Sequence, residues 1–189
     1  NNKLYVVNNV LLLDYLKWLW EVSNSENTEK IKTIIISART YAYWYMKKDR
    51  KFDWEFYDAS DDPDVFQKYL WYWLEQRSPN INKIVENTKW EFITYDWEII
   101  KPWYFSSSEW KTLSFNDYCL AKYDNSDCKE YLWKYPFLSS VKDPGWIWKN
   151  KAWHWVWISW VWTSYFSSRW WSHQIIISYF LRGVKVERL

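Results

Sequence analysis

Two basic side chains lie at helical spacing in the first third of the chain. Between residues 28 and 48, apolar side chains recur every three or four positions, which predicts a helix with one buried face. Lys32 and Arg39 are seven positions apart within it, so they project from the same face. Together they could hold carboxylate or amide groups through charge-assisted hydrogen bonds, whereas the ordinary interpretation is a solvated helix face.

Two cysteines, Cys119 and Cys128, are nine positions apart. This spacing suits neither a zinc knuckle nor a CxxC redox site. We interpret them as two unrelated thiols. The alternative is a disulfide that closes a loop, if the protein is exported.

Tryptophan occupies positions that are typical of glycine. The chain has 20 Trp and 2 Gly, whereas average usage would give roughly 13 Gly in a chain of this length. Trp97 follows Asp96 between two strand-like runs, where Asp-Gly is the strongest hairpin signal. Residues 153–162 read WHWVWISWVW, a density of indoles that would need an unusually large cavity or an exposed apolar wall. Our hypothesis is that UGA codons, which encode glycine in some bacterial lineages, are rendered here as tryptophan.

The composition is that of an ordinary folded protein. The chain is 49% hydrophobic and 25% charged, which allows a sizeable core, and its net charge of +2 gives no reason to expect nucleic acid as a partner. Its apolar runs are far shorter than the ~20 residues of a membrane span. We expect residues 1–189 to form a single domain that lacks its extreme N-terminal part, since no signal-peptide pattern opens the chain.

The other elements are predicted from shorter patterns. We expect a strand pair within residues 4–13, a short helix over 61–74, two or three strands over 83–105 around the Trp97 turn, loops with a short helix over 116–134, and a terminal strand over 184–186. Helices and strands mix without βαβ regularity. The predicted class is therefore α+β: one long amphipathic helix packed with antiparallel strands and glycine-rich-type loops.

Four ordered motifs carry a resemblance to a known family. Residues 14–42 read DYLKWLWEVSNSENTEKIKTIIISARTYA, residues 102–112 PWYFSSSEWKT, residues 136–144 PFLSSVKDP, and residues 153–159, with Trp read as Gly, GHGVGIS. In this order they resemble the SpoIID/LytB domain of stage II sporulation protein D and amidase enhancers. The closing ARTYA of the first motif ends the predicted long helix.

The chain departs from the family pattern at several places. Val22 and Ser23 follow the signature glutamate in place of Met and Pro, Ile34 replaces a usual glutamine, and Glu109 replaces a glycine. Some members bind zinc through Cys and His, but no matching Cys-His cluster is present in this sequence. We therefore predict no metal and no other cofactor.

The resemblance implies lytic transglycosylase activity on peptidoglycan glycan strands, with Glu21 in the position of the signature glutamate. A single carboxyl group suffices because the nucleophile is a hydroxyl of the substrate itself, and cleavage leaves a 1,6-anhydro sugar. Partial burial beside Leu19 and Val22 would raise the pKa of Glu21 as this role requires. The ordinary interpretation of Glu21 alone is a solvated loop acid.

The resemblance also implies a substrate-binding set. Its members are Lys32, Arg39, Tyr104, Ser108, His154 and Ser159. Their polar groups suit sugar hydroxyls and amides, but each also has an ordinary structural interpretation.

Two alternatives to catalysis stay open. The first is a non-catalytic amidase enhancer or cell-wall binding module, whose partner is a cell-wall amidase. The second is a Trp-rich carbohydrate-binding protein, which needs authentic indoles on one face. On the family interpretation the domain works in the extracytoplasmic cell envelope, with any signal or anchor outside this chain.

Overall fold

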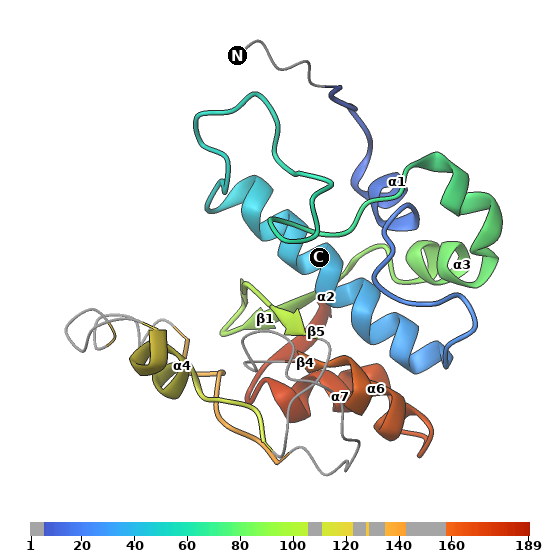
Figure 1. Ribbon diagram of the computed structural model, residues 1–189. Coiled ribbons are helices and arrows are strands. Elements are labelled where there is room, and N and C mark those ends of the chain that lie inside the picture. Colours follow the sequence, from blue (N-terminus) through green and yellow to red (C-terminus); the bar gives the residue numbers. More distant parts are fainter. Residues whose placement is uncertain (1–5, 106–110, 123–127, 129–134, 143–157) are drawn as a thin grey trace.

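The computed structural model describes residues 6–105, 111–122, 128, 135–142 and 158–189 (Figure 1). The helices are α1 (Leu12–Lys17), α2 (Thr28–Lys47), the 3₁₀ helix η1 (Tyr72–Arg77), α3 (Pro79–Asn87), α4 (Phe115–Lys122), α6 (Trp160–Ser167) and α7 (His173–Phe180). The strands are β1 (Glu91–Tyr95), β2 (Glu98–Ile99), β3 (Tyr104–Phe105), β4 (Ile158–Ser159) and β5 (Lys185–Arg188). This mixture confirms the predicted α+β class.

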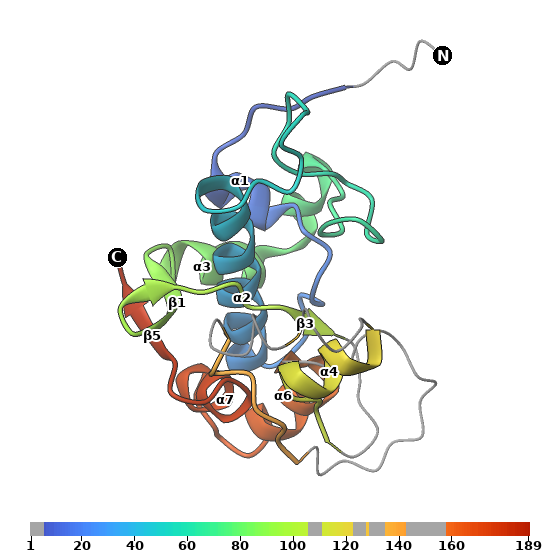
Figure 2. The same ribbon diagram turned by 90° about the vertical axis from the view of Figure 1, so that its left-hand side faces the viewer.

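The long helix α2 is the centre of the molecule. It contacts α1 and α3 on one side and β1, α6 and α7 on the other, as the two views in Figures 1 and 2 show. Its bounds confirm the predicted helix, and Asn27 caps its start by accepting a hydrogen bond from the backbone N–H of Glu29 (2.9 Å). The helix is buried almost all round, beyond the single buried face that was predicted, because elements from both halves of the chain pack on it.

Polar side chains inside α2 are satisfied locally. The hydroxyls of Thr33, Ser37 and Thr40 each donate to the carbonyl four residues earlier, at 2.7 to 2.8 Å. The Thr40 hydroxyl also accepts the backbone N–H of Ile93 (3.1 Å) and so fastens the helix to β1. These bonds let a helix with several hydroxyls lie in the core.

Two small sheets flank α2. The first has the order β2-β1-β5 and is antiparallel, and Ile93 pairs with Val186 at its centre. The second consists of β3 and β4 in parallel, with Tyr104 opposite Ile158 and Phe105 opposite Ser159. Strands from residue 158 onward therefore complete both sheets.

The predicted hairpin around Trp97 is confirmed. Tyr95 pairs with Glu98, and the two loop residues Asp96 and Trp97 have φ of 49° and 66°, as a type I′ turn requires. Trp71 (φ 68°) and Trp170 (φ 65°) also adopt positive φ.

Positive φ is rare for a bulky side chain and easy for glycine. Three of the four non-glycine residues with positive φ in the described parts are tryptophans, which supports the codon hypothesis. Peptide mass spectrometry of the native protein tests it, and tryptophan retained at positions 71, 97 and 170 would end it.

Other predicted elements are wrong or displaced. Residues 6–11 form no strand and residue 12 begins α1, because Leu12, Leu13 and Leu16 pack as a helical face against α2 and α3. Residues 61–74 form turns, an isolated bridge and the start of η1 in place of the predicted helix, and residues 83–87 belong to α3. The terminal strand is confirmed as β5.

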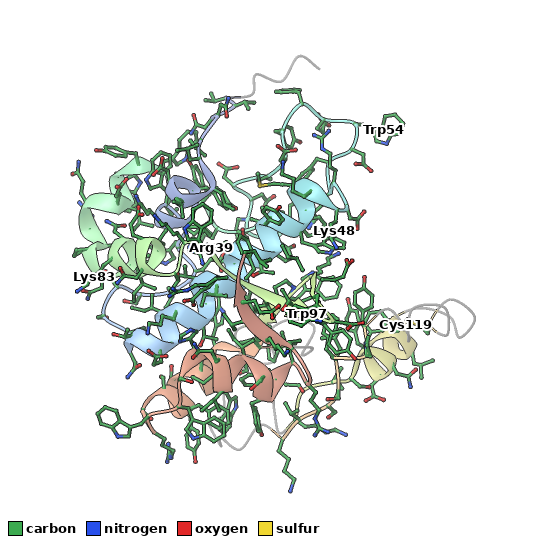
Figure 3. The ribbon with its side chains drawn as sticks, turned by 180° about the vertical axis from the view of Figure 1, so that it is seen from behind. Arg39, Lys48, Trp54, Lys83, Trp97 and Cys119 are labelled. Carbon is green, nitrogen blue, oxygen red and sulfur yellow. A yellow bond between two sulfur atoms is a disulfide. The ribbon has the colours of Figure 1, made fainter. Side chains whose placement is uncertain are left out.

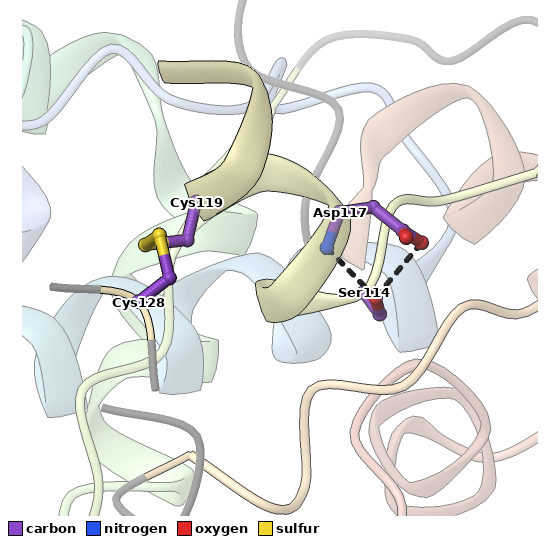
Figure 4. Close-up of a disulfide and its surroundings, with 4 residues drawn as sticks. All are labelled: Ser114, Asp117, Cys119 and Cys128. Carbon is purple, nitrogen blue, oxygen red and sulfur yellow. Dashed lines mark hydrogen bonds between the residues drawn. A yellow bond between two sulfur atoms is a disulfide. The ribbon is translucent and has the colours of Figure 1, made fainter. Parts of the chain in front are cut away.

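The interpretation of the cysteines as unrelated thiols is wrong. Cys119, on α4, and Cys128 form a disulfide with a Cα–Cα distance of 5.6 Å (Figure 4). Ser114 and Asp117 bond reciprocally at the start of α4, through a Ser114 hydroxyl that donates to Asp117 Oδ2 (2.8 Å) and accepts its backbone N–H (3.1 Å). Both side chains of the disulfide are buried, so the link itself lies in the core.

Within the described residues, no helix has the length and apolar character needed to cross a membrane. No group of three or more His, Cys, Asp or Glu side chains in the same residues is arranged to hold a metal ion.

Candidate functional site

Glu21 lies at the end of one of two paired extended segments. Residues 18–21 run alongside residues 67–70, where the Trp20 N–H donates to Lys68 O (2.8 Å) and the Leu70 N–H donates to Trp18 O (2.9 Å). The next bond in this ladder goes to a side chain, because the Lys68 N–H donates to Glu21 Oε1 (2.8 Å). The pairing thus turns the Glu21 carboxyl group inward.

The carboxyl group of Glu21 lies in an environment that favours its protonated form. The residue is only 8% exposed. Burial raises its pKa to about 7, against the opposing effect of hydrogen bonds from the Lys68 N–H and the Tyr104 hydroxyl and of the Lys68 charge. Glu21 is therefore a buried acid that exchanges its proton near neutral pH, and the interpretation as a solvated loop acid is wrong.

Tyrosines from three elements lie close enough to Glu21 for its charge to raise their pKa. Tyr15 comes from α1, Tyr41 from α2 and Tyr104 from β3, and burial followed by the charge of Glu21 raises the pKa of Tyr15 and Tyr104 well above the usual value. Burial is also the main cause of the raised pKa of Tyr41, to which Glu21 contributes. These phenols therefore stay protonated and act as hydrogen-bond donors to acceptors near Glu21.

Gln67 joins two of these tyrosines. Its side chain is almost fully buried and hydrogen-bonds to the hydroxyls of Tyr15 (2.9 Å) and Tyr104 (2.8 Å) and to the carbonyl of Ala38 (3.2 Å). Sequence patterns gave no signal for Gln67, because it lies in an irregular segment and its role arises from contacts with residues distant in the chain.

A cavity of about 680 Å³ lies next to this cluster. Its lining is formed by the segment 6–10, by residues 56–61 and by side chains that include Tyr15, Phe66 and Tyr69. Glu21 does not line it, whereas Tyr15 both borders the cavity and bonds to Gln67. The tyrosine thus connects the surface of this hollow with the buried acid.

Lys32 and Arg39 lie apart from Glu21. Lys32 forms an ion pair with Glu29 (2.7 Å), and neither basic residue is among the groups that shift the pKa of Glu21. Arg39 is fully buried, and its guanidinium donates to the carbonyls of Val85 (3.1 Å) and Glu91 (3.2 Å) and to the Thr88 hydroxyl (3.2 Å). Figure 3 shows Arg39 in the interior, where it links α2 to the end of α3 and the start of β1.

Two other predicted substrate-binding residues are near each other. Tyr104 and Ser159 belong to the paired strands β3 and β4, and Tyr104 also hydrogen-bonds to Glu21. Ser159 is fully buried, and its hydroxyl has no hydrogen-bond partner among the described residues. Ser108 and His154 lie outside the described residues.

Comparison with known proteins identifies the family of this chain. A family model for SpoIID, stage II sporulation protein, matches residues 1–95. The matched range is half of the chain and contains Glu21, Gln67 and the whole of α2. A search of curated proteins finds no match. The family is associated with the cell envelope and points to a sporulation or cell-wall role. The chain belongs to the SpoIID family of stage II sporulation proteins.

Proposed function

We propose that this domain cleaves the glycan strands of peptidoglycan as a lytic transglycosylase, with Glu21 as its single catalytic acid and base. The observation that carries the proposal is the environment of Glu21: an 8% exposed carboxyl group, with burial raising its pKa to about 7. A general acid works best when its pKa is near the working pH, and perturbed carboxyl groups gather at functional sites. The family membership points to a sporulation or cell-wall role, and this role supports peptidoglycan as the proposed substrate.

The proposed reaction has two proton transfers. Protonated Glu21 gives its proton to the glycosidic oxygen as the bond to the anomeric carbon breaks. The resulting carboxylate then takes the proton of the sugar's own hydroxymethyl oxygen as that oxygen bonds to the anomeric carbon. The product is a 1,6-anhydro sugar, no water is consumed, and Glu21 ends protonated as it began.

Tyr104 is the best-supported member of the proposed substrate-binding set. Its hydroxyl bonds to Glu21, so a sugar at the carboxyl group would also meet this phenol. Ser159 lies on the neighbouring strand, while Ser108 and His154 are proposed on the family motifs alone. Lys32 and Arg39 stay predictions, because their described bonds are to protein groups.

We also propose an extracytoplasmic location for the domain. The Cys119–Cys128 disulfide supports this location, because disulfides persist in oxidising compartments and are rare in the cytosol. The partners proposed there are peptidoglycan strands and a cell-wall amidase.

The test is digestion of purified peptidoglycan by the protein and by a Glu21→Gln variant, with mass spectrometry of the soluble products. We expect anhydro-muropeptides from the wild type and a loss of about 10²–10⁴-fold in the variant, the usual contribution of a general acid. Glu26→Gln is the matched control, because Glu26 lies in the same loop, is partly exposed and forms an ion pair with Lys30 (2.6 Å). Equal cleavage by the Glu21→Gln variant would refute the proposal.

An enhancer role predicts a different result. The wild type would then release no anhydro products but would stimulate a purified cell-wall amidase, and Glu21→Gln would stimulate it equally. A carbohydrate platform of indoles receives less support, because the highly exposed Trp54 and Trp97 lie on separate parts of the surface (Figure 3).

A further inference from the structure

Gln67 is the most deeply buried uncharged amide near the proposed acid. It is 2% exposed, and its side chain makes three hydrogen bonds to groups from three different elements, namely Tyr15 on α1, Ala38 on α2 and Tyr104 on β3. Burial of a primary amide is costly unless its groups are bonded. The arrangement therefore fixes the amide in one orientation.

The partners determine the direction of each bond. Ala38 contributes a carbonyl oxygen, which can only accept, so Nε2 of Gln67 must lie on that side. The same nitrogen donates to the Tyr104 oxygen, and Oε1 on the other side accepts the hydroxyl of Tyr15. Because the Tyr104 oxygen already accepts a bond, its own proton points elsewhere, and Glu21 is the group that receives it.

We propose that Gln67 is a positioning residue that fixes the Tyr104 hydroxyl as a hydrogen-bond donor to the Glu21 carboxyl group. The bonds form a directed chain from Tyr15 through Gln67 and Tyr104 to Glu21. A donor aimed at the carboxyl group stabilises its charged form. In the proposed reaction, which gives this inference its catalytic meaning, that form arises when Glu21 has released its proton.

The groups around Glu21 allow the effect of the Tyr104 donor on its titration to be measured. The titratable side chains that interact with its carboxyl group are Tyr15, Tyr41, Tyr104 and Lys68, and the Lys68 N–H is the other donor to it. The tyrosines stay protonated at neutral pH. A change in the titration of Glu21 near pH 7 therefore reports on the donors that reach it.

The experiment follows the carboxyl carbon of Glu21 by NMR titration in the intact protein carrying labelled glutamate. In Gln67→Met the Tyr104 proton loses its fixed direction, and the midpoint of Glu21 should rise by about one pH unit, a tenfold change in proton affinity. Tyr104→Phe should give a similar rise. The double variant should rise no further than either single variant, because both changes remove the same donor.

The control is Gln174→Met, the same substitution on the exposed face of α7, which should leave the midpoint unchanged. Gln67→Glu keeps the size and a polar end at position 67, and serves if the methionine variant fails to fold. Its carboxylate accepts from Tyr104 and also adds a negative charge near Glu21, so the midpoint should rise by more than in the methionine variant. An unchanged midpoint in a folded variant, or additive shifts in the double variant, would overturn the proposal.

The titration is separate from glycan cleavage. The Gln67 variants could shift the titration midpoint of Glu21 while the wild type cleaves no glycan. This result would support the positioning role of Gln67 and refute the proposed function. If cleavage occurs, the pH at which activity falls on the alkaline side should increase with the titration midpoint of Glu21. The reason is that the protonated acid then persists to higher pH.

Discussion

Two carboxyl groups near the start of α2 have opposite environments. Glu21 precedes the helix and meets phenols and the backbone N–H of Lys68, and its pKa is raised to about 7, chiefly by burial. Glu29 lies in the first turn, where burial also acts to raise the pKa, but hydrogen bonds from Lys32 and His173 outweigh it and lower the pKa to about 2. His173 in turn lies between Glu29 (2.7 Å) and Glu91 (3.2 Å).

The difference separates a group that can do chemistry from one that holds the structure. A carboxylate beside a lysine and a histidine stays charged over the physiological range and ties α2 to α7, whose His173 also contacts Glu91 of β1. A carboxyl group among neutral donors exchanges a proton at the pH where the protein works. Sequence distance alone does not distinguish them, since only eight positions separate the two residues.

The largest expected effect on stability is at Glu21. Its native pKa of about 7 lies above the ordinary value of 4.5, so the native state holds the proton more tightly and stability falls as the pH rises from about 4.5 to 7. Glu21→Gln removes this decline, and its stability relative to the wild type should grow by up to about 3 kcal/mol across that window. Urea unfolding at a series of pH values measures it. Glu26→Gln, the matched control, should show no comparable growth.

Glu29 should show the reverse dependence. Its native pKa of about 2 lies below the ordinary value, so its contribution is present at neutral pH and is lost as the pH falls from about 4.5 to 2. Because the side chain is partly exposed, we expect Glu29→Gln to cost about 1–2 kcal/mol at pH 7. Unfolding curves at pH 7 and pH 2.5 check this. A cost that persists undiminished at the lower pH, or an equal cost in the exposed Glu55→Gln, would contradict it.

Lys32→Met should give the smallest effect. It removes the hydrogen bond from Lys32 to Glu29 and leaves those from His173, so the pKa of Glu29 should rise only part of the way to its ordinary value. The expected loss of stability is below about 1 kcal/mol, as for partly exposed ion pairs. NMR titration of both glutamates in the same sample measures the change. A matching shift at Glu21 would break the distinction between the two regions.

The sequence predicts the parts of this molecule that depend on local pattern. The spacing of Ile31, Ile34 and Ile35 indicates α2, and Asp96 with Trp97 indicates the hairpin, because each signal lies within one element. The family motif and the apolar neighbours of Glu21 predict a partly buried acid with a raised pKa, but not the groups that surround it. The pairing of residues 18–21 with 67–70 joins segments some fifty positions apart, and no local pattern encodes such a contact.

The failures have the same origin. Residues 4–13 carry a β-like apolar run, yet packing against α2 and α3 makes its end helical. The cysteine spacing alone fits both free thiols and a disulfide. The structure decides between them, because Cys119 on α4 lies beside Cys128. Lys32 and Arg39 bind protein groups: Lys32 pairs with Glu29 of α2 itself, and Arg39 donates to carbonyls of α3 and β1.

Because elements from both halves of the chain surround α2, shortening the chain should expose this helix. The family match ends at residue 95, but α6 and α7, which cover one flank of the helix, and β5, which pairs with β1, come from beyond residue 157. A fragment truncated at residue 95 would leave that flank bare to water, so we expect it to aggregate when expressed alone. Co-expression of residues 1–110 with the remainder should instead yield a soluble, non-covalent pair, as two parts of one folding unit.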